Sequence, residues 1–399
     1  MVRPFRFILA AVVLPALAVF AALFSLSSVA TALMPERATQ LPVLNRNAFA
    51  AEAVAGLAGL GAPQESDAAR RLGRAGRETF LSEPTNANAV SLLAMARQLA
   101  GDTPVARALY EDALRIDKRN RIANLWLIED ASANGRVGYI LDRYDVLLRT
   151  GGPTSTALYD TLATALREPA IIPHLEARLA RNPPWAEQFW LRVAPNPGAI
   201  ANLGELRIRL LDRTIANPAN NDDDITRRLV GVGAFDIAAR LVERRLGPPP
   251  ADRMEIRNSR FARKTQAPPF DWETYSGAGF GGEIDPAGRA LSFFAEAGVD
   301  NLVAHQLLEA RPGRYALAYR VRNPDALAPL DSALRVKCAN PSSPALGTLP
   351  MRGATGETTL SVPSSCRYLW VEIWARRKSP TSDYSDDVEI DSIVLRAAA

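Results

Sequence analysis

Histidine is scarce in this chain of 399 residues, which contains only His174 and His305. A Ser–His–acid catalytic site needs a nucleophile, a base and an orienting acid within hydrogen-bond reach, and the two histidines fall in different predicted domains. Clustered histidines and cysteines, which the usual zinc sites need, are also absent from the sequence. We therefore expect no hydrolytic triad and no zinc centre, and both histidines should be structural or lie at the surface.

Lysine is equally rare, and no long block of positive charge occurs. The formal net charge is only +4, and all but four of the 47 basic residues are arginines, which alternate with acidic residues along the predicted helices. Proteins that bind nucleic acid usually concentrate basic side chains on one face or in one run. The sequence therefore predicts a solvated surface of mixed charge and no nucleic-acid partner.

Charge is missing altogether from Phe7 to Met34, and Arg3 and Arg6 precede this stretch. A helix needs about 20 apolar residues to cross the hydrocarbon core of a bilayer. Positive charge before such a span favours an N-terminus that stays in the cytoplasm. We expect a single-pass anchor in the cytoplasmic (inner) membrane, with the bulk of the chain on the periplasmic or extracytoplasmic side.

A cleavable signal peptide is the alternative for the same stretch. Ser28-Val29-Ala30 and Ala30-Thr31-Ala32 both have the small-x-small form of a signal-peptidase site. The apolar regions of signal peptides usually span about 7–15 residues, so the length of this run favours a retained anchor. Both interpretations export the remainder of the chain.

Only two cysteines are present, Cys338 and Cys366. Outside the cytoplasm a disulfide is the default for such a pair, whereas cytoplasmic pairs more often remain free thiols. The expected export therefore predicts that these two cysteines are joined, and closing a loop of this length should stabilise the fold by about 3.5 kcal/mol.

The hydrophobic pattern changes once along the chain. Helical periodicity continues to about Leu246, where Gly247-Pro248-Pro249-Pro250 ends it, and alternation typical of strands begins at Phe270. The predicted fold class is multidomain, α then β. The expected parts are a membrane anchor or signal peptide (1–34), a tether (35–47), an α-helical solenoid (48–246), a linker (247–269) and an antiparallel β-sandwich (270–399).

A repeat of 34 residues stands out in the helical part, where Asn86 and Asn120 each close a similar turn before a helix. The helices expected between these turns cover 87–100 and 104–116, and later ones cover 155–166, 171–180, 185–193, 199–214, 223–230 and 235–246. The repeat resembles a tetratricopeptide repeat (TPR) on the residues Leu93, Ala94, Ala106, Tyr110 and Ala113. That family's Trp, Tyr and closing Pro are replaced here by Val90, Arg97 and Lys118. The resemblance implies a TPR-like solenoid that binds envelope proteins.

Eight strands are expected in the last 130 residues, separated by turns rich in Pro, Gly and Asn. They cover 270–275, 289–295, 302–308, 314–322, 332–338, 358–362, 368–376 and 388–395. The run from Gly277 to Gly282 contains the dinucleotide fingerprint G-x-G-x-x-G, but no helix follows it, so we expect a flexible β-turn instead of a phosphate loop.

Two segments of this β-region resemble galactose-binding-like and carbohydrate-binding jelly rolls. The first is Gln306-Leu307-Leu308 followed by Arg311-Pro312-Gly313-Arg314-Tyr315, and the second is Val388 to Ile393. The resemblance implies a jelly roll that can contact a glycan. Such jelly rolls often carry a structural calcium, for which Asp383, Asp386, Asp387, Glu389 and Asp391, with Asp271 or Glu273, would supply oxygen ligands. A solvated acidic loop is the favoured interpretation, so no metal is assigned.

One predicted strand carries an aromatic row, consisting of Tyr368, Trp370, Glu372 and Trp374. Leu369, Val371, Ile373 and Ala375 alternate with these residues and form an aliphatic row. A sandwich has one inner face, so one row must point outward. If the aliphatic row is core, the two tryptophans lie on the outer face, either open to bind a sugar ring or protein or packed under the helices. Both alternatives remain open at this point.

These features predict a non-enzymatic, membrane-anchored envelope scaffold. Its solenoid should hold protein partners and its sandwich should contact glycan or protein, and such an architecture resembles accessory proteins of surface-polysaccharide synthesis and export. The alternative class is a glycan-active hydrolase or lyase. Such an enzyme needs paired carboxylates at a fixed separation, and the sequence does not locate such a pair.

Overall fold

A computed structural model describes residues 65–150, 155–213, 221–247, 254–296, 298–340, 345–378 and 387–398, with a few isolated positions before residue 30. The expected membrane segment lies outside these ranges, apart from isolated positions within it. Within the part of the chain that is described, no helix is both long enough and apolar enough to cross a membrane. The chain divides into two compact units, Met1–Leu158 and Tyr159–Ala399. The described part is helical first and then forms two antiparallel sheets, so the predicted order, α then β, is confirmed.

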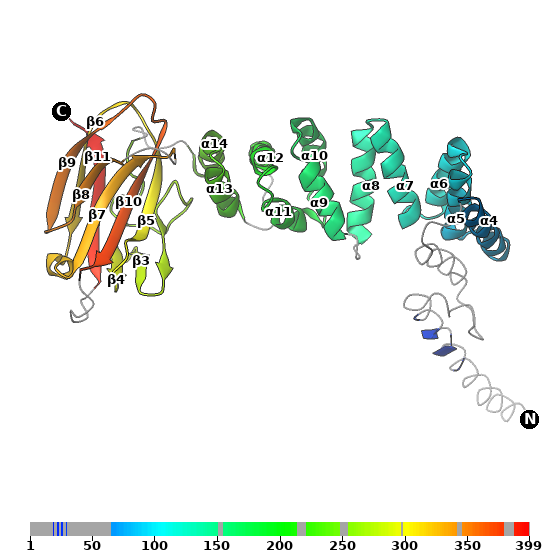
Figure 1. The fold of residues 1–399 in the computed structure, drawn as a ribbon, viewed down its shortest axis with the longest axis horizontal. Helices are drawn as coiled ribbons and strands as arrows, with labels where there is room; N and C mark the ends of the chain where they lie inside the picture. The colour runs from blue at the N-terminus through cyan, green and yellow to red at the C-terminus, as the bar shows by residue number, and fades with distance from the viewer. Residues whose placement is uncertain are drawn as a thin grey trace, which may run out of the picture. The chain divides into compact units, whose positions relative to one another are not determined.

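Successive helices contact one another along the first unit (Figure 1). They are α4 (Glu65–Ser82), α5 (Ala87–Leu99), α6 (Thr103–Ile116), α7 (Arg121–Ala133) and α8 (Val137–Thr150), and α9 (Ser155–Ala165) crosses the unit boundary. The Asn86 side chain accepts hydrogen bonds from the first backbone N–H groups of α5, and the Asn120 side chain accepts one at the start of α7. Both asparagines therefore cap helices, as the 34-residue spacing predicts.

Small side chains let α5 and α6 approach closely. Ala94, Ala106 and Ala113 are fully buried, and they surround Tyr110, which stacks on Trp126 with ring centroids 4.6 Å apart. Leu93, the fifth residue of the repeat pattern, is half-buried and instead faces Gly76 of α4. Four of the five pattern residues thus lie in the core between neighbouring helices.

The second unit begins with further short helices. They are η1 (Pro169–Ile171), α10 (Ile172–Leu179), α11 (Ala186–Val193), α12 (Ile200–Asp212), α13 (Asp222–Gly231) and α14 (Phe235–Leu246). A buried ion pair joins α12 to the start of α13, because Arg207 donates two hydrogen bonds to Asp222 at 2.7 and 3.1 Å. Removing one partner of such a buried pair leaves an uncompensated charge, so the pair holds these two helices in register.

Two antiparallel sheets complete the second unit (Figure 1). Their strands are β1 (Glu273–Thr274), β2 (Ser276–Gly277), β3 (Phe280–Asp285), β4 (Ala290–Ala295), β5 (Asn301–Glu309), β6 (Gly313–Val321), β7 (Leu330–Cys338), β8 (Ala345–Pro350), β9 (Thr355–Val362), β10 (Tyr368–Arg377) and β11 (Val388–Ala397), with η2 (Pro324–Leu327) before β7. One sheet has the order β1-β5-β10-β7-β8 and the other β2-β3-β4-β11-β6-β9. All eight expected strands are present, and β2, β3 and β8 were not expected.

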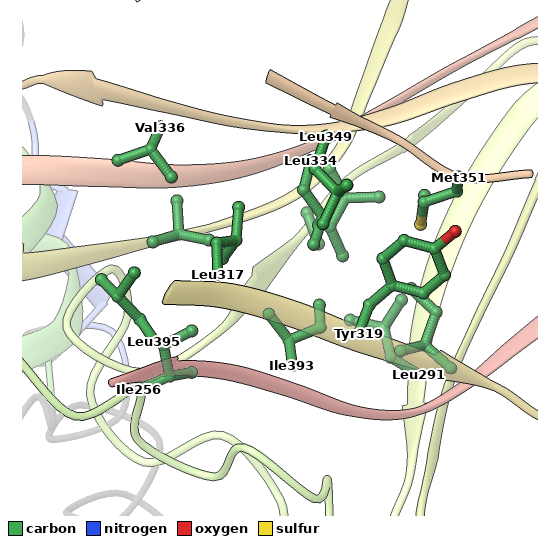
Figure 2. Packing of buried hydrophobic residues seen from close by; sticks show 14 of the residues in the cluster. Ile256, Leu291, Leu317, Tyr319, Leu334, Val336, Leu349, Met351, Ile393 and Leu395 are labelled. Atoms are coloured by element: carbon green, nitrogen blue, oxygen red, sulfur yellow. The ribbon is translucent and has the colours of Figure 1, made fainter. Parts of the chain in front are cut away.

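The hydrophobic core of the sandwich lies between the two sheets. Figure 2 shows Leu334 and Val336 of β7 facing Leu317 of β6 and Leu395 of β11, and all four are buried. Residues 254–261, which were expected in a linker, add Met254, Ile256 and Phe261 to this core. A disulfide joins Cys338 at the end of β7 to Cys366 before β10, with the two Cα atoms 5.5 Å apart. The predicted cysteine pairing is therefore confirmed.

The glycine-rich run from Gly277 to Gly282 forms the β2–β3 hairpin and not an unstructured turn. Gly279 sits at the turn with a φ of 80°, which favours glycine. Gly282 brings β3 against β5 of the other sheet, since a Cβ atom at this position would lie 2.5 Å from the Val303 carbonyl oxygen. These glycines therefore serve a close approach of backbones, and the prediction of flexibility was wrong.

Candidate functional site

The two rows of β10 face opposite sides of their sheet. Leu369, Val371, Ile373 and Ala375 are buried in the core between the sheets, as one alternative from the sequence required. The aromatic row consequently lies on the outer face. It is not open along its length, because Tyr368 and Glu372 are buried while Trp370 and Trp374 are half-buried. The expectation of a uniformly exposed row is therefore corrected.

Helix α14 covers the first residue of the aromatic row. The Tyr368 ring lies against Phe235 with centroids 5.3 Å apart, and its hydroxyl donates a hydrogen bond of 2.9 Å to Asp236. Arg367 holds the same carboxylate through two further hydrogen bonds of 2.8 and 3.0 Å. At this end the row packs under a helix, which is the other alternative considered from the sequence.

Trp370 is fixed by a neighbour from β5. Its ring stacks on the imidazole of His305 with centroids 4.3 Å apart and the planes 21° from parallel. Strand register explains this contact, because His305 pairs with Glu372 of β10 on one side and with Glu273 of β1 on the other. Trp370 therefore has one face occupied by His305 and remains partly accessible to solvent.

Three hydrogen-bonding groups converge on His305. Its Nε2 atom lies 2.9 Å from the Tyr275 hydroxyl and 3.1 Å from a carboxylate oxygen of Glu273. The other Glu273 oxygen accepts a hydrogen bond of 2.5 Å from Arg227 of α13. Helix α13 is thus tied to the edge strand β1, close to the aromatic row.

The charges around this cluster shift two pKa values in opposite directions. Burial alone would raise the pKa of Glu273, but hydrogen bonds from His305 and Arg227 and their positive charge outweigh it, and the pKa is lowered. Burial, together with the negative charge of Glu273, raises the pKa of Tyr275. The carboxylate therefore stays ionised and the phenol stays protonated at neutral pH.

Glu372 and Trp374 form the far end of the row. The indole N–H of Trp374 donates a hydrogen bond of 2.7 Å to Glu372, and Lys337 of β7 approaches the other carboxylate oxygen to 2.8 Å. The guanidinium of Arg335 lies over the Trp374 ring, 4.7 Å from its centroid. A half-buried indole is thereby oriented among charged groups that can exchange hydrogen bonds with a ligand.

The geometry suits recognition of a flat, partly apolar ligand with many hydroxyls. Indole faces bury the C–H face of such a ligand, and the neighbouring carboxylate, ammonium and guanidinium groups supply acceptors and donors. Sequence reasoning identified the four residues of the aromatic row. It missed the partners from other strands, namely Glu273, Tyr275, His305, Arg335 and Lys337, because only the strand register brings them to one face.

The acidic residues considered for calcium do not come together where the structure describes them. Arg322 forms ion pairs with Glu389 and Asp391 of β11. Asp271 is buried beside Trp272, whose backbone N–H it accepts, and Glu273 belongs to the other sheet. Asp383 and Asp386 lie outside the described residues. Within the described ranges, no group of three or more His, Cys, Asp or Glu side chains could hold a metal ion.

Two further sequence features lie away from this cluster. His174 is on α10, as the sequence predicts, and His305 is on β5. No protein-family model matches the chain, and no curated protein is similar to it. Any function must therefore be inferred from the chemistry of the side chains themselves.

Proposed function

We propose that this protein is a non-enzymatic, membrane-anchored envelope scaffold whose β-sandwich contacts a glycan through the outer end of the aromatic row. One observation carries the proposal: Trp370 and Trp374 are half-buried, and their neighbours hold them in fixed orientations on one face of a sheet. Fixed aromatic rings lose little conformational freedom when a ligand binds, which favours affinity.

The surroundings of Trp374 favour carbohydrate over a purely apolar partner. Glu372, Lys337 and Arg335 lie within reach of any ring stacked on this indole. A sugar presents both an apolar face and hydroxyls, so it can use the indole and the charged groups together. A protein partner would use the same surface through a larger apolar contact, and α14 already covers the Tyr368 end in that manner.

The helical part supports the scaffold role. Asn86 and Asn120 cap equivalent helices 34 residues apart, and buried alanines pack around Tyr110. We take this part to be a TPR-like solenoid, in which stacked helical pairs present an extended surface to protein partners. The β-part is then a galactose-binding-like jelly roll at its end.

The disulfide supports a location outside the cytoplasm. A bond between Cys338 and Cys366 persists in an oxidising compartment. Together with the uncharged segment from Phe7 to Met34, it favours a single-pass protein of the inner membrane that faces the periplasm. An accessory role in synthesis or export of surface polysaccharide follows from this location and the glycan contact. Protease added to spheroplasts should digest the domains and leave a small membrane-held fragment, and protection of the whole chain would rule out this topology.

A glycan-active lyase or hydrolase is the second candidate, and one contact favours it. Tyr275, His305 and Glu273 meet at the His305 Nε2 atom, and phenol, imidazole and carboxylate groups can all transfer protons. Against catalysis, Arg227 and His305 both occupy the Glu273 carboxylate, and the Trp370 ring covers one face of the imidazole. The cluster is thus better explained as a support for the aromatic row.

A glycan array probed with the purified full-length chain tests both candidates. We expect retention on specific polysaccharides with no change in their length, and loss of retention in Trp374→Ala. His305→Gln separates the two classes, because an enzyme would lose turnover completely whereas a binding protein would keep most of its affinity. Shortened or unsaturated products in the wild-type wells would establish the enzyme and refute the scaffold.

A further inference from the structure

A second hollow lies at one end of the sandwich, away from the aromatic row. It is a pocket of about 530 Å³, within the range of about 300–1,000 Å³ that is usual for small-molecule sites. Residues of η2, the start of β7, the turn after β8 and the end of β10 line it, and we call it the end pocket.

Hydrogen bonds from four segments hold the walls of the end pocket in place. The Met351 N–H donates to the Ser332 carbonyl at 2.8 Å, and the Arg352 N–H donates to the Tyr319 hydroxyl at 3.0 Å. Lys378 donates from its N–H to Pro329 and from Nζ to the Ala328 carbonyl, both at 2.9 Å. Figure 2 shows Met351 beside Tyr319. The pocket is therefore preformed.

A buried hydroxyl inside this wall has no partner. Ser332 lines the pocket from the inner face of β7, it is 3% exposed, and its Oγ makes no hydrogen bond with any described residue. Buried polar groups are nearly always paired, and an unpaired one costs stability. An unpaired hydroxyl in a pocket wall is a group available to a ligand.

The charged groups at the rim have a definite balance. The Arg352 and Lys378 side chains form no ion pair with any described residue, and the Asp325 carboxylate forms none either. Asp331 also lines the pocket, but Arg376 holds its carboxylate at 2.8 Å. Two cations thus face one carboxylate, so the available charge favours an anionic ligand.

Apolar side chains complete the lining. Leu327, Leu330 and Met351 are nearly fully buried, and prolines 324 and 350 flank them. A ligand for the end pocket therefore needs one negative group, several hydroxyls and an apolar face.

We infer that the end pocket binds a carboxylate-bearing sugar, a hexuronic acid, either free or at the end of a chain. Its carboxylate would accept charge-assisted hydrogen bonds from Arg352 and Lys378, and its hydroxyls would reach Ser332 and Asp325. Its C–H face would lie on the leucine and methionine side chains. This site is separate from the aromatic row, so either can bind without the other.

Calorimetric titration of the full-length chain with glucuronate and galacturonate tests the inference. Both acids should bind, and glucose and galactose, which lack the carboxylate, should bind at least tenfold more weakly. Lys378→Gln and Arg352→Gln should each lower the affinity about fivefold or more. Arg314→Gln is the matched control, because Arg314 is an exposed arginine at the opposite end of β6, and this variant should bind normally.

Ser332→Ala separates recognition from folding. The Ser332 hydroxyl makes no internal bond, so the variant should keep or raise the melting temperature while affinity falls about three- to tenfold. Equal binding of glucose, equal competition by glutamate, or unchanged affinity in Lys378→Gln would overturn the inference, as would an absence of binding. Trp370→Ala should leave uronate binding intact even if it abolishes retention on polysaccharide, so failure of one site is distinguishable from failure of the other.

Discussion

At the scale of single residues, β10 divides its two functions between alternate side chains. Ile373 and its aliphatic neighbours are fully buried between the sheets, whereas Trp374 on the other face is half-buried and contacts Glu372 and Arg335. Stability should therefore depend on the aliphatic row and recognition on the outer end of the aromatic row.

Truncating one residue from each row tests this division. Ile373→Ala removes buried methyl groups and should lower the free energy of unfolding by about 2–5 kcal/mol. Trp374→Ala removes one hydrogen bond and one cation–π contact, and it should cost about 1–2 kcal/mol. Denaturant unfolding of the full-length chain measures both. Equal losses would show that the aromatic row is structural and would remove the main support for a contact surface.

Glu273 should make the second unit sensitive to acid. Its pKa is lowered in the folded state because hydrogen bonds and charge from His305 and Arg227 outweigh the opposing effect of burial. A lowered pKa contributes stability above the ordinary value of 4.5, and this contribution is lost as pH falls through the folded-state value. Tyr275 stays protonated throughout this range, since its pKa is raised.

Glu273→Gln should accordingly be about 1–3 kcal/mol less stable at pH 7 and should approach the wild type below pH 4. Thermal melts from pH 3 to pH 7 provide the comparison. The buried Asp271, whose pKa is raised by burial, is common to both chains and cancels. A constant difference between the two proteins across this pH range would contradict the assignment.

At the scale of elements, periodicity located the helices and most strands to within a few residues. Alternation could not identify β3 and β8, because β3 begins with glycines and β8 contains Gly347 and Pro350, which are poor strand formers. The partners of the aromatic row also escaped prediction. They depend on which residue of β5 stands opposite which residue of β10, and local sequence does not encode that register.

The glycine run offers a test at this scale. Gly282→Ala places a methyl group 2.5 Å from the Val303 carbonyl oxygen, so β3 and β5 must separate. We expect a loss of about 1–3 kcal/mol, which is typical of overpacking. Gly298 is the control, because nothing lies within 4 Å of an added Cβ there, and Gly298→Ala should be neutral or stabilise by about 0.4–1 kcal/mol. Similar melting temperatures for the two variants would refute the close approach.

At the scale of the whole molecule, the disulfide links the stability of the sandwich to its compartment. Cys338 and Cys366 are 28 residues apart, and the loop-entropy model assigns about 3.5 kcal/mol to this crosslink. A protein stabilised in this way is best suited to an oxidising environment. The proposed periplasmic location and the glycan contact both depend on that environment.

Mass spectrometry of unreduced peptides should recover the Cys338–Cys366 pair from freshly exported protein. The double variant Cys338→Ser, Cys366→Ser should unfold at lower denaturant concentration by an amount that corresponds to about 3–4 kcal/mol. Free thiols that alkylate completely before any reduction would argue against export into an oxidising compartment.

Titration of the full-length chain with a polysaccharide retained on the array, followed by tryptophan fluorescence, tests the central claim most directly. Trp370 and Trp374 are half-buried on the outer face, whereas Trp190 and Trp272 are fully buried and should not respond. We predict a saturable change in the wild type and in Arg314→Gln, a much weaker one in Trp374→Ala, and polysaccharide of unchanged length afterwards. An identical titration curve for Trp374→Ala, or shortened polysaccharide, would contradict a glycan-binding scaffold.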